Sequence, residues 1–494
     1  MLGSKPVCSS VTQAIYLAEQ VRAGERQVAA DLGIEMYTLM ESAGSAVFRQ
    51  LQQFWPEATR ILVCCGGGNN GGDGYIVATL AHEAGIDVTV WSTSDPDRLK
   101  GDAEKACRRW RDTGGEIGTP QQVLPEVDLV VDAIFGIGLD RPVEGLIRDL
   151  ICAINESGSP VLAVDLPSGL HADTGSVLGV AVKAAATVSF IALKAGLLTG
   201  KGREHCGTVI YEDLGVGDAF EAAFPPDMFV LTDFTMSPRH RAAHKGDFGK
   251  LLCIGGNKGM MGAIMLASDA AIRSGAGLVA AATRNENRPY LTLHRPEVMA
   301  PLSEHLEAGL PPLNWATCLA VGPGLGQDEW SVSALDAALE SKLPVVLDAD
   351  ALNLLAAQPS KVTQAVLTPH PGEAARLLGC SVSEIESDRI SAARSLFDKF
   401  GAVIVLKGAG TIVYDGDKLN IICAGNPGMA SAGMGDVLTG IISALWAQGL
   451  SGADAALYGA MAHAKAGDLA ARQGERGLLA SDVIQQLRNV LNQI

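Results

Sequence analysis

The sequence predicts an α/β protein built from two three-layer α/β/α domains. Short apolar segments alternate with amphipathic segments along most of the 494 residues, which is the pattern of parallel strands with helices on both faces. The 57 glycines are about 12% of the chain against ~7% on average, which indicates many tight turns. The alternation lapses over 214–245, so we expect domains at 1–222 and 223–494.

Composition and charge exclude several classes of protein. Lys and Arg number 38 and Asp and Glu 55, a net charge of −17, which argues against a general nucleic-acid binder because that needs a basic face. A 48% hydrophobic content with 19% charged residues excludes a disordered chain. No ~20-residue apolar span and no signal peptide is found. The ten cysteines form no C-x-x-C pair, so we expect reduced thiols in a soluble, cytoplasmic protein without a membrane partner.

The first half is expected to begin with helices and then to alternate. Apolar residues spaced by three and four predict helices around 14–21 and 39–51. After them we expect strands at 60–65, 87–91, 128–135, 160–166 and 187–193, and a helix at 75–83.

A second alternating array follows the proline-containing stretch at 214–245. Its apolar runs are short and lie between glycines, as in buried parallel strands. We expect strands at 250–255, 277–282, 317–321, 344–347, 364–367 and 402–406, and helices at 262–274 and 438–446.

The run Gly66-Gly67-Gly68-Asn69-Asn70-Gly71-Gly72-Asp73-Gly74 lies between a predicted strand and a predicted helix. Glycines let the backbone approach a ligand closely, and N–H groups at a helix start bind phosphate. The alternative is a glycine-rich surface turn. The polar side chains of Asn69, Asn70 and Asp73 within the run favour a ligand site.

Two acidic residues close apolar strands in the same half. Asp132 is followed by Gly136-Ile137-Gly138, and Asp165 by Pro167-Ser168-Gly169. A buried Asp is unfavourable unless it is paired, bound to metal or functional, although either could also cap the next helix. With the glycine run, these residues predict one cleft whose carboxylate, amide and hydroxyl oxygens suit a hard cation.

The segments 66–74, 132–138 and 165–169 resemble the epimerase domain of the NAD(P)H-hydrate repair enzymes, over about residues 11–215. That family acts on NAD(P)HX, the hydrated and redox-inactive form of NAD(P)H. The resemblance implies a Rossmann-like domain, Asp165 as the acid/base at the nicotinamide ring, and K⁺ held by Asn70, Asp132 and Ser168. It also implies substrate contacts at Asn69, Asn70, Gly71, Gly72, Asp73, Gly136, Ile137, Gly138, Leu139, Asp140, Arg141, Pro142 and Asp165.

The sharpest motif of the second half is the glycine-rich run 425–437, which ends in Gly435-Asp436 at the start of an apolar helix. Backbone N–H groups there can surround a phosphoryl group, and Asp436 can take the proton of an attacking hydroxyl. The alternative is a helix-capping Asp. A second glycine loop, 405–411, follows a strand and could bind a nucleotide phosphate, without the spacing of a Walker A loop.

Three further predicted strands end in polar or glycine-rich segments, 322–326, 348–353 and 368–373. His370 lies between two prolines in the last of these. A lone His is usually structural, but its rigid place at a strand end favours ligand contact. No zinc or calcium motif is found.

Together with 244–249 and 255–256, these segments resemble ribokinase-like proteins, and more closely the ADP/ATP-dependent NAD(P)HX dehydratases, over about residues 233–487. The resemblance implies hydrate contacts at Ala263, Gly324, His370 and Asp436. It implies nucleotide contacts at Lys407, Gly408, Ala409, Gly410, Thr411 and Gly435. The proline-containing stretch 214–245 indicates few shared core contacts, so a fragment that begins near Asp233 is expected to fold and to dehydrate one epimer only.

The two resemblances together predict a bifunctional enzyme. One domain would epimerise R- and S-NAD(P)HX, and the other would use ADP or ATP with Mg²⁺ to dehydrate the S epimer by phosphorylating its C6 hydroxyl, with Asp436 as the base. The alternatives are a small-molecule (vitamin) kinase in the second domain and a non-catalytic nucleotide-binding module in the first. We expect small-molecule substrates, no nucleic acid, and a homo-oligomer. The sequence does not choose between ADP and ATP, or between NADHX and NADPHX.

Overall fold

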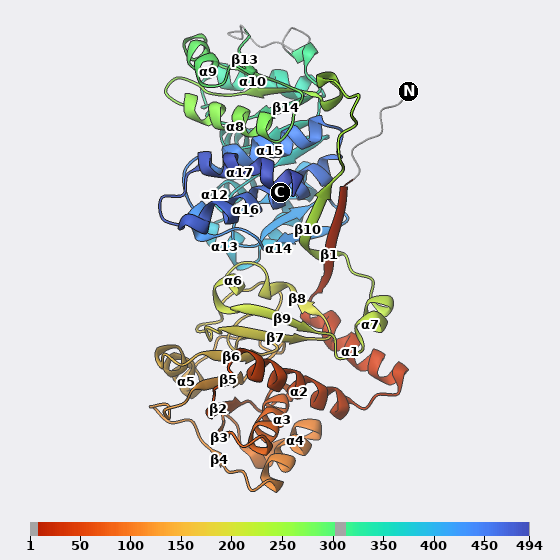
Figure 1. Ribbon diagram of the computed structural model, residues 1–494, viewed down its shortest axis with the longest axis vertical. Coiled ribbons are helices and arrows are strands. Elements are labelled where there is room, and N and C mark those ends of the chain that lie inside the picture. Colours follow the sequence, from red (N-terminus) through yellow and green to blue (C-terminus); the bar gives the residue numbers. More distant parts are fainter. Residues whose placement is uncertain (1–7, 302–312, 494) are drawn as a thin grey trace. The chain divides into compact units, whose positions relative to one another are not determined.

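The computed structural model describes residues 8–301 and 313–493 (Figure 1). The described chain forms two compact units. One spans residues 14–228, and the other combines residues 8–13 with those from 229 onward. Both are α/β with parallel strands, which confirms the predicted fold class.

The N-terminal unit is a parallel sheet in the order β4-β3-β2-β5-β6-β7-β9. Its central strands are apolar and buried on both faces, as a sheet covered by helices requires. The order reverses between β2 and β5, where ligands bind beyond the carboxyl ends of the strands. The strands are β2 (Arg60–Cys65), β3 (Asp87–Ser92), β4 (Ile117–Gly118), β5 (Leu129–Ala133), β6 (Val161–Val164), β7 (Ala186–Phe190) and β9 (Thr208–Glu212).

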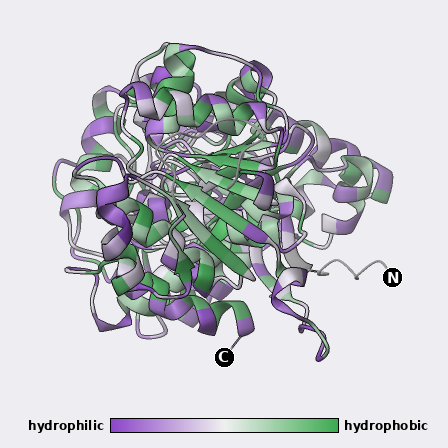
Figure 2. Cartoon of the chain, turned by 90° about the horizontal axis from the view of Figure 1, so that it is seen from above, coloured by the Kyte–Doolittle hydropathy of each residue, from purple (hydrophilic) through white to green (hydrophobic). Residues whose placement is uncertain are grey.

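Helices cover both faces of this sheet. Residues of α2, α3 and α4 share one core with Ile61 and Val63 of β2, whereas those of α5 pack with Leu62 and Val130 on the other face. Figure 2, which colours the whole chain by hydropathy, shows mainly hydrophobic strands surrounded by helices with hydrophilic residues on their outer faces. The helices are α1 (Ala18–Leu32), α2 (Met36–Phe54), α3 (Asn69–Glu83), α4 (Gly101–Asp112), α5 (Gly145–Glu156), α6 (Gly202–His205) and α7 (Gly217–Ala223).

In the C-terminal unit the order is β13-β12-β11-β14-β15-β16-β17-β18-β19-β10, followed by the first part of β1. The strands from β13 to β17 are parallel, whereas β17, β18 and β19 form antiparallel pairs. The strands are β1 (Cys8–Tyr16), β10 (Met228–Met236), β11 (Lys250–Ile254), β12 (Leu278–Ala282), β13 (Val298–Met299), β14 (Cys318–Val321), β15 (Val345–Leu347), β16 (Ala365–Leu367), β17 (Val403–Leu406), β18 (Thr411–Tyr414) and β19 (Leu419–Ile422).

One core of this unit joins α15, α16 and α17 to strands β10 and β15 to β19, and a second joins α8 to β11, β12 and β14. None of the helices in the described part of the chain is long and apolar enough to cross a membrane. The helices are α8 (Met261–Arg273), α9 (Arg288–His294), α10 (Glu329–Glu340), α11 (Asp350–Ala357), α12 (Pro371–Leu378), α13 (Val382–Ser387), α14 (Arg389–Phe400), α15 (Met434–Ala447), α16 (Gly452–Ala470) and α17 (Ala480–Asn492).

The structure corrects two expectations about local structure and adds two strands. The helix predicted from residue 14 begins only at Ala18, because Ile15 and Tyr16 pair as a strand with β8 (Leu193–Lys194). The alternation does not lapse over 214–245, which holds α7 and β10. The antiparallel strands β18 and β19 were not predicted, because their short apolar runs lie among turn residues.

Candidate active sites

The glycine-rich run after β2 is one third loop and two thirds helix. Only 66–68 is loop, and α3 begins at Asn69, so the predicted loop over 66–74 is too long. A Cβ on Gly66 would lie 1.9 Å from the carbonyl oxygen of Ile134, and one on Gly71 2.0 Å from that of Gly66. Glycine is therefore required for the backbone to pass this closely between β2 and β5.

Asp165 follows β6 with a backbone φ of +66°. Residues other than glycine rarely adopt this conformation, and where they do the strain is often part of a functional site. The Nζ of Lys194 lies 2.5 Å from Oδ1 of Asp165, and the backbone N–H of Phe190 and the hydroxyl of Ser189 also donate to Oδ1, at 3.3 Å. No residue in the described part of the chain donates to Oδ2, which leaves that oxygen free to exchange a proton.

Lys194 lines the pocket but belongs to none of the motifs found in the sequence. Its ammonium is buried and donates to Asp165, to the carbonyl oxygen of Phe190 at 2.8 Å and to the hydroxyl of Ser189 at 3.3 Å. The sequence signal was a single Lys within the apolar run 188–198. A Lys in such a run is either paired or functional.

Asp132 ends β5 and is completely buried. Its Oδ2 accepts a hydrogen bond from the Ser168 N–H at 2.7 Å, and its Oδ1 one from the Ser168 hydroxyl at 2.6 Å. Burial raises the pKa of Asp132 to about 6, against the lowering effect of these bonds. Asn70 lies beside Gly136, and its buried Nδ2 has no hydrogen-bond partner among the described residues. These three side chains offer one carboxylate, one amide and one hydroxyl, a donor set that fits a monovalent cation.

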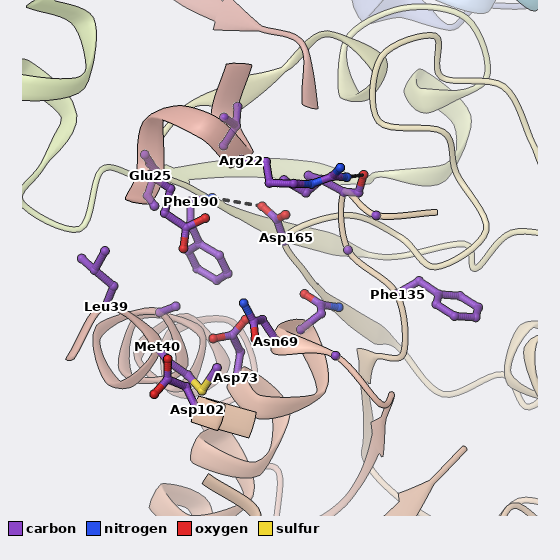
Figure 3. A pocket seen from close by; sticks show the side chains of 18 of the residues that line it. Arg22, Glu25, Leu39, Met40, Asn69, Asp73, Asp102, Phe135, Asp165 and Phe190 are labelled. Carbon is purple, nitrogen blue, oxygen red and sulfur yellow. Dashed lines mark hydrogen bonds between the residues drawn. The ribbon is translucent and has the colours of Figure 1, made fainter. Parts of the chain in front are cut away.

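These elements surround a cavity of about 490 Å³ (Figure 3), a size typical of small-ligand sites. The predicted Gly71 and Gly72 are buried beside it without lining it, and Asp140, Arg141 and Pro142 are exposed outside its lining. Residues that the motifs did not indicate also line it, among them Arg22, Glu25, Met40, Phe190 and Lys194. The predicted residues in its lining are Asn69, Asn70, Asp73, Gly136, Ile137, Gly138, Leu139 and Asp165.

In the C-terminal unit a buried ion cluster lies beside the start of α15. Asp348, at the end of β15, accepts hydrogen bonds from Nζ of Lys407 at 2.8 Å and from the Thr439 hydroxyl at 2.9 Å. Lys407 also lies 3.6 Å from Glu373. Burial opposes the charge on Asp348, but the attraction of Lys407 and the hydrogen bonds outweigh it and hold its pKa below the usual value.

Asp436 lies in the first turn of α15. Burial, and after it the negative charge of Asp348, raise the pKa of Asp436 to about 7, while Lys407 lowers it. A Cβ on Gly435 would lie 3.2 Å from Nζ of Lys407 and 3.4 Å from Oδ2 of Asp348. The helix start, the ammonium and the predicted base therefore meet at one place.

His370 is placed by the capping of α12. Its Nδ1 accepts a hydrogen bond from the Gly372 N–H at 3.0 Å, and its Nε2 lies 3.4 Å from Glu373. Burial, opposed by Glu373 and aided by Lys407, lowers the pKa of His370. The ring is half exposed, so it is available to a ligand beside the ion cluster.

Ala263 and Gly324 lie side by side: a Cβ built on Gly324 would be 3.1 Å from the Cβ of Ala263. The loop that holds Gly324 reaches the ion cluster: a Cβ on Gly322 would be 1.8 Å from the carbonyl oxygen of Asp348. Ala349, next in the chain, has a φ of +48°, a second strained position at a predicted site.

The predicted nucleotide loop, 407–411, follows β17. The buried Arg389 donates to the carbonyl oxygens of Leu406 at 3.2 Å and of Lys407 at 3.1 Å. A Cβ on Gly408 would lie 2.8 Å from the guanidinium nitrogens of Arg389, so a side chain there would push the guanidinium away from these carbonyls. The Lys407 side chain turns instead toward Asp348, so this loop and the ion cluster are joined by one residue. Of the predicted nucleotide contacts, Lys407, Gly408, Ala409 and Gly410 lie in this loop, whereas Thr411 is the first residue of β18.

Comparisons with known proteins find matches to both units of the chain. A family model described as NAD(P)H-hydrate dehydratase matches residues 251–489, and one described as YjeF-related protein N-terminus matches residues 36–196. The bifunctional NAD(P)H-hydrate repair enzyme of Vibrio cholerae is 47% identical over 97% of this chain and 98% of its own. That of Escherichia coli is 47% identical over 98% of this chain and 95% of its own.

Among solved structures, the ADP/ATP-dependent NAD(P)H-hydrate dehydratase from Bacillus subtilis, co-crystallised with ATP and Mg²⁺, is 30% identical. It covers 52% of this chain and 94% of its own, with a TM-score of 0.49. The identity to full-length relatives over nearly the whole chain excludes a kinase fused to an unrelated module. The chain belongs to the bifunctional NAD(P)H-hydrate repair enzymes, which join an epimerase to a dehydratase.

Proposed function

We propose that the pocket of the N-terminal unit binds the nicotinamide ring of NAD(P)HX and that Asp165 transfers the proton there. The observation that carries this proposal is Asp165 itself, which lines the pocket on a strained backbone. Its Oδ1 is held by Lys194, while Oδ2 accepts no hydrogen bond from the described residues. The substrate contacts are assigned to the motif residues 69–73 and 136–142. Asn69, Asn70, Asp73 and 136–139 line the pocket, which supports that part of the assignment.

We further propose that Asn70, Asp132 and Ser168 hold K⁺. Asp132 is a completely buried acid with no cationic side chain within ion-pair distance among the described residues, and a monovalent cation would balance its charge. When bound, the ion supplies positive charge beside the substrate. The chain's own residues then order the segments that follow β5 and β6, since Ser168 hydrogen-bonds Asp132 and accepts from the Phe135 N–H at 2.8 Å.

In the C-terminal unit we assign the phosphorylation of the C6 hydroxyl to the start of α15. Asp436 takes the hydroxyl proton, and the N–H groups before and within the first turn hold the transferred phosphoryl group. Phosphate is a far better leaving group than hydroxide, so the electron pair on ring N1 can expel it. Ala263, Gly324 and His370 contact the hydrate.

The phosphoryl donor is ADP or ATP, bound by 407–411 and Gly435. Mg²⁺, when present, neutralises charge on the phosphate oxygens. The hydrogen bonds from Arg389 to the carbonyls at 406 and 407 support this site, because they fix the backbone of the loop. Chromatography of both hydrate epimers with ADP or ATP in turn tests the assignment: loss of the hydrate with neither nucleotide would contradict it.

The pKa of Asp436 predicts the pH dependence of dehydration. A base must be unprotonated to act, and the pKa of Asp436 is raised to about 7, largely by burial. The dehydration rate at saturating substrate is therefore expected to fall about tenfold per unit as the pH drops well below 7. In Asp436→Asn the residual rate should lack this acid limb. If the rate of that variant still falls in the same way at low pH, the pH dependence belongs to another titrating group.

The two activities are proposed to reside in separable parts, with the functional boundary near 222/223. A cut at Asp233 falls inside β10, whose Leu231 and Phe234 are buried in the core with α15 to α17. We therefore expect a fragment of residues 227–494 to fold and dehydrate the S epimer, and one of 233–494 to be less stable. Thermal unfolding and dehydration assays of both compare them. Equal stability would show that the first half of β10 is dispensable.

We also propose a cytoplasmic homo-oligomer that acts on NADHX and NADPHX. The reduced state of the nine cysteines whose side chains are described, most of them buried, supports a reducing compartment. Light scattering of the purified chain tests the oligomeric state.

A further inference from the structure

The epimerase pocket holds a second carboxyl group with a different environment. Asp73, on α3, lines the cavity with Asp165, yet its carboxyl makes no hydrogen bond to any residue in the described part of the chain. Asp165, in contrast, is paired with Lys194. Two carboxyl groups in one site with unlike surroundings are the usual arrangement for an acid and a base.

The two groups lie on different walls of the cavity. Asp165 comes from the end of β6 and Asp73 from the helix that follows β2. Figure 3 shows Asp165 on the upper side of the open space and Asp73 on the lower side. They are close enough for their charges to interact.

We propose that Asp73 is the second proton-transfer residue of the epimerase and acts on the face of the nicotinamide ring opposite Asp165. The proposal rests on the role proposed for Asp165. Its chemical basis is that removing the C6 hydroxyl from one face and adding water to the other needs a proton-transfer group on each face.

The protonation of Asp73 fits this role. Burial, and then the negative charges of Asp165 and Glu25, raise its pKa well above the usual range, while Lys194 lowers it. Glu25 is the rival candidate. Its strongest charge interaction is with Lys194, and Figure 3 shows it near the level of Asp165, so it lies on the same side as the ion pair.

The reaction then balances with solvent water as co-reactant. The carboxyl of Asp73 gives its proton to the C6 hydroxyl, the C6–O bond breaks, and its electron pair leaves with the water formed. The lone pair of N1 forms the N1=C6 double bond, which makes C6 planar. A second water adds to C6 from the other face, the π pair returns to N1, and the carboxylate of Asp165 accepts the proton.

One turnover thus moves a proton from Asp73 to Asp165, and the opposite inversion returns it. Each inversion replaces the C6 oxygen with one from solvent. A variant that keeps only one of the two groups can still remove and restore the hydroxyl on the face of that group. It should therefore exchange the oxygen of one epimer without inverting it.

The test uses the full chain and separated R- and S-NADHX in H₂¹⁸O, without ADP or ATP so that dehydration is idle. Chromatography measures inversion, and mass spectrometry measures ¹⁸O in each epimer. Asp73→Asn should lower inversion ~10²–10⁴-fold and retain exchange in one epimer only. Asp165→Asn should retain exchange in the other epimer. Glu25→Gln should lower inversion less than tenfold, and Asp73→Glu should recover part of the loss.

Inversion by Asp73→Asn at the parental rate would overturn the proposal, as would exchange of the same epimer in both variants. Parental inversion that keeps the original C6 oxygen would also overturn it, because that outcome requires cleavage of the N1–C6 bond instead. Inversion at the parental rate in Asp165→Asn alone would contradict the proposed role of Asp165. The effect of Asp73→Asn on inversion would still test the role of Asp73. Thermal unfolding and KM of each variant separate a folding defect from a lost proton transfer.

Discussion

Replacement of Asp165 with Ala is expected to stop the interconversion of R- and S-NAD(P)HX. The variant removes a carboxylate that lines the pocket and leaves the ammonium of Lys194 without its acidic partner. With excess ADP or ATP, a mixture of epimers should react only until the S epimer is consumed, whereas the parent should consume all of it. Chromatography of the mixture over time measures this.

A matched control separates the loss of a base from the loss of a cation. Asp132→Ala should weaken substrate binding because it removes the buried carboxylate assigned to K⁺, and added K⁺ should partly restore activity. Asp165→Ala should not respond to K⁺. A mixture that runs to completion with Asp165→Ala, faster than the spontaneous interconversion, would refute the role of this residue.

Replacement of Asp436 with Asn is expected to lower dehydration of the S epimer ~10²–10⁴-fold, the usual contribution of a general base. Asn keeps the shape of the side chain at the start of α15, so nucleotide affinity should change little. Initial rates at saturating ADP or ATP measure the loss.

Epimerisation should be unchanged in Asp436→Asn. All residues that line the pocket assigned to the epimerase lie between Val21 and Leu214. Thermal unfolding of the variant checks that the helix start is intact. Dehydration at the parental rate would reduce Asp436 to a residue that stabilises the helix.

The motifs predicted the positions of the candidate sites, because each motif directly follows a predicted strand. The carboxyl ends of parallel strands share one edge of a sheet, so Asp132 and Asp165 were predicted to lie in one cleft. Asp165 lines the pocket, whereas Asp132 is buried outside its lining. The same rule brought 348–353 and 368–373 together, and the structure joins them through Lys407, which lies within ion-pair distance of Asp348 and Glu373.

Local structure was less predictable where pairing over long sequence distances decides it. The apolar spacing around Ala14 suits a helix. The backbone of Ile15 and Tyr16 instead pairs as a parallel strand with that of Leu193 and Lys194. The helix of the glycine-rich run begins at Asn69 although glycine disfavours helix. Glycine is needed at position 71 because a side chain there would collide with the backbone of Gly66.

By itself the sequence determined the α/β class, the family and the two sets of polar strand ends, because each depends on residue type and spacing along the chain. Only the tertiary structure decided which charges meet. Lys194 is 29 residues from Asp165, and Lys407 is 59 residues from Asp348. The strain at Asp165 and the raised pKa values of Asp73 and Asp436 likewise depend on burial and on neighbouring charges. These arise only when distant segments pack and exclude water.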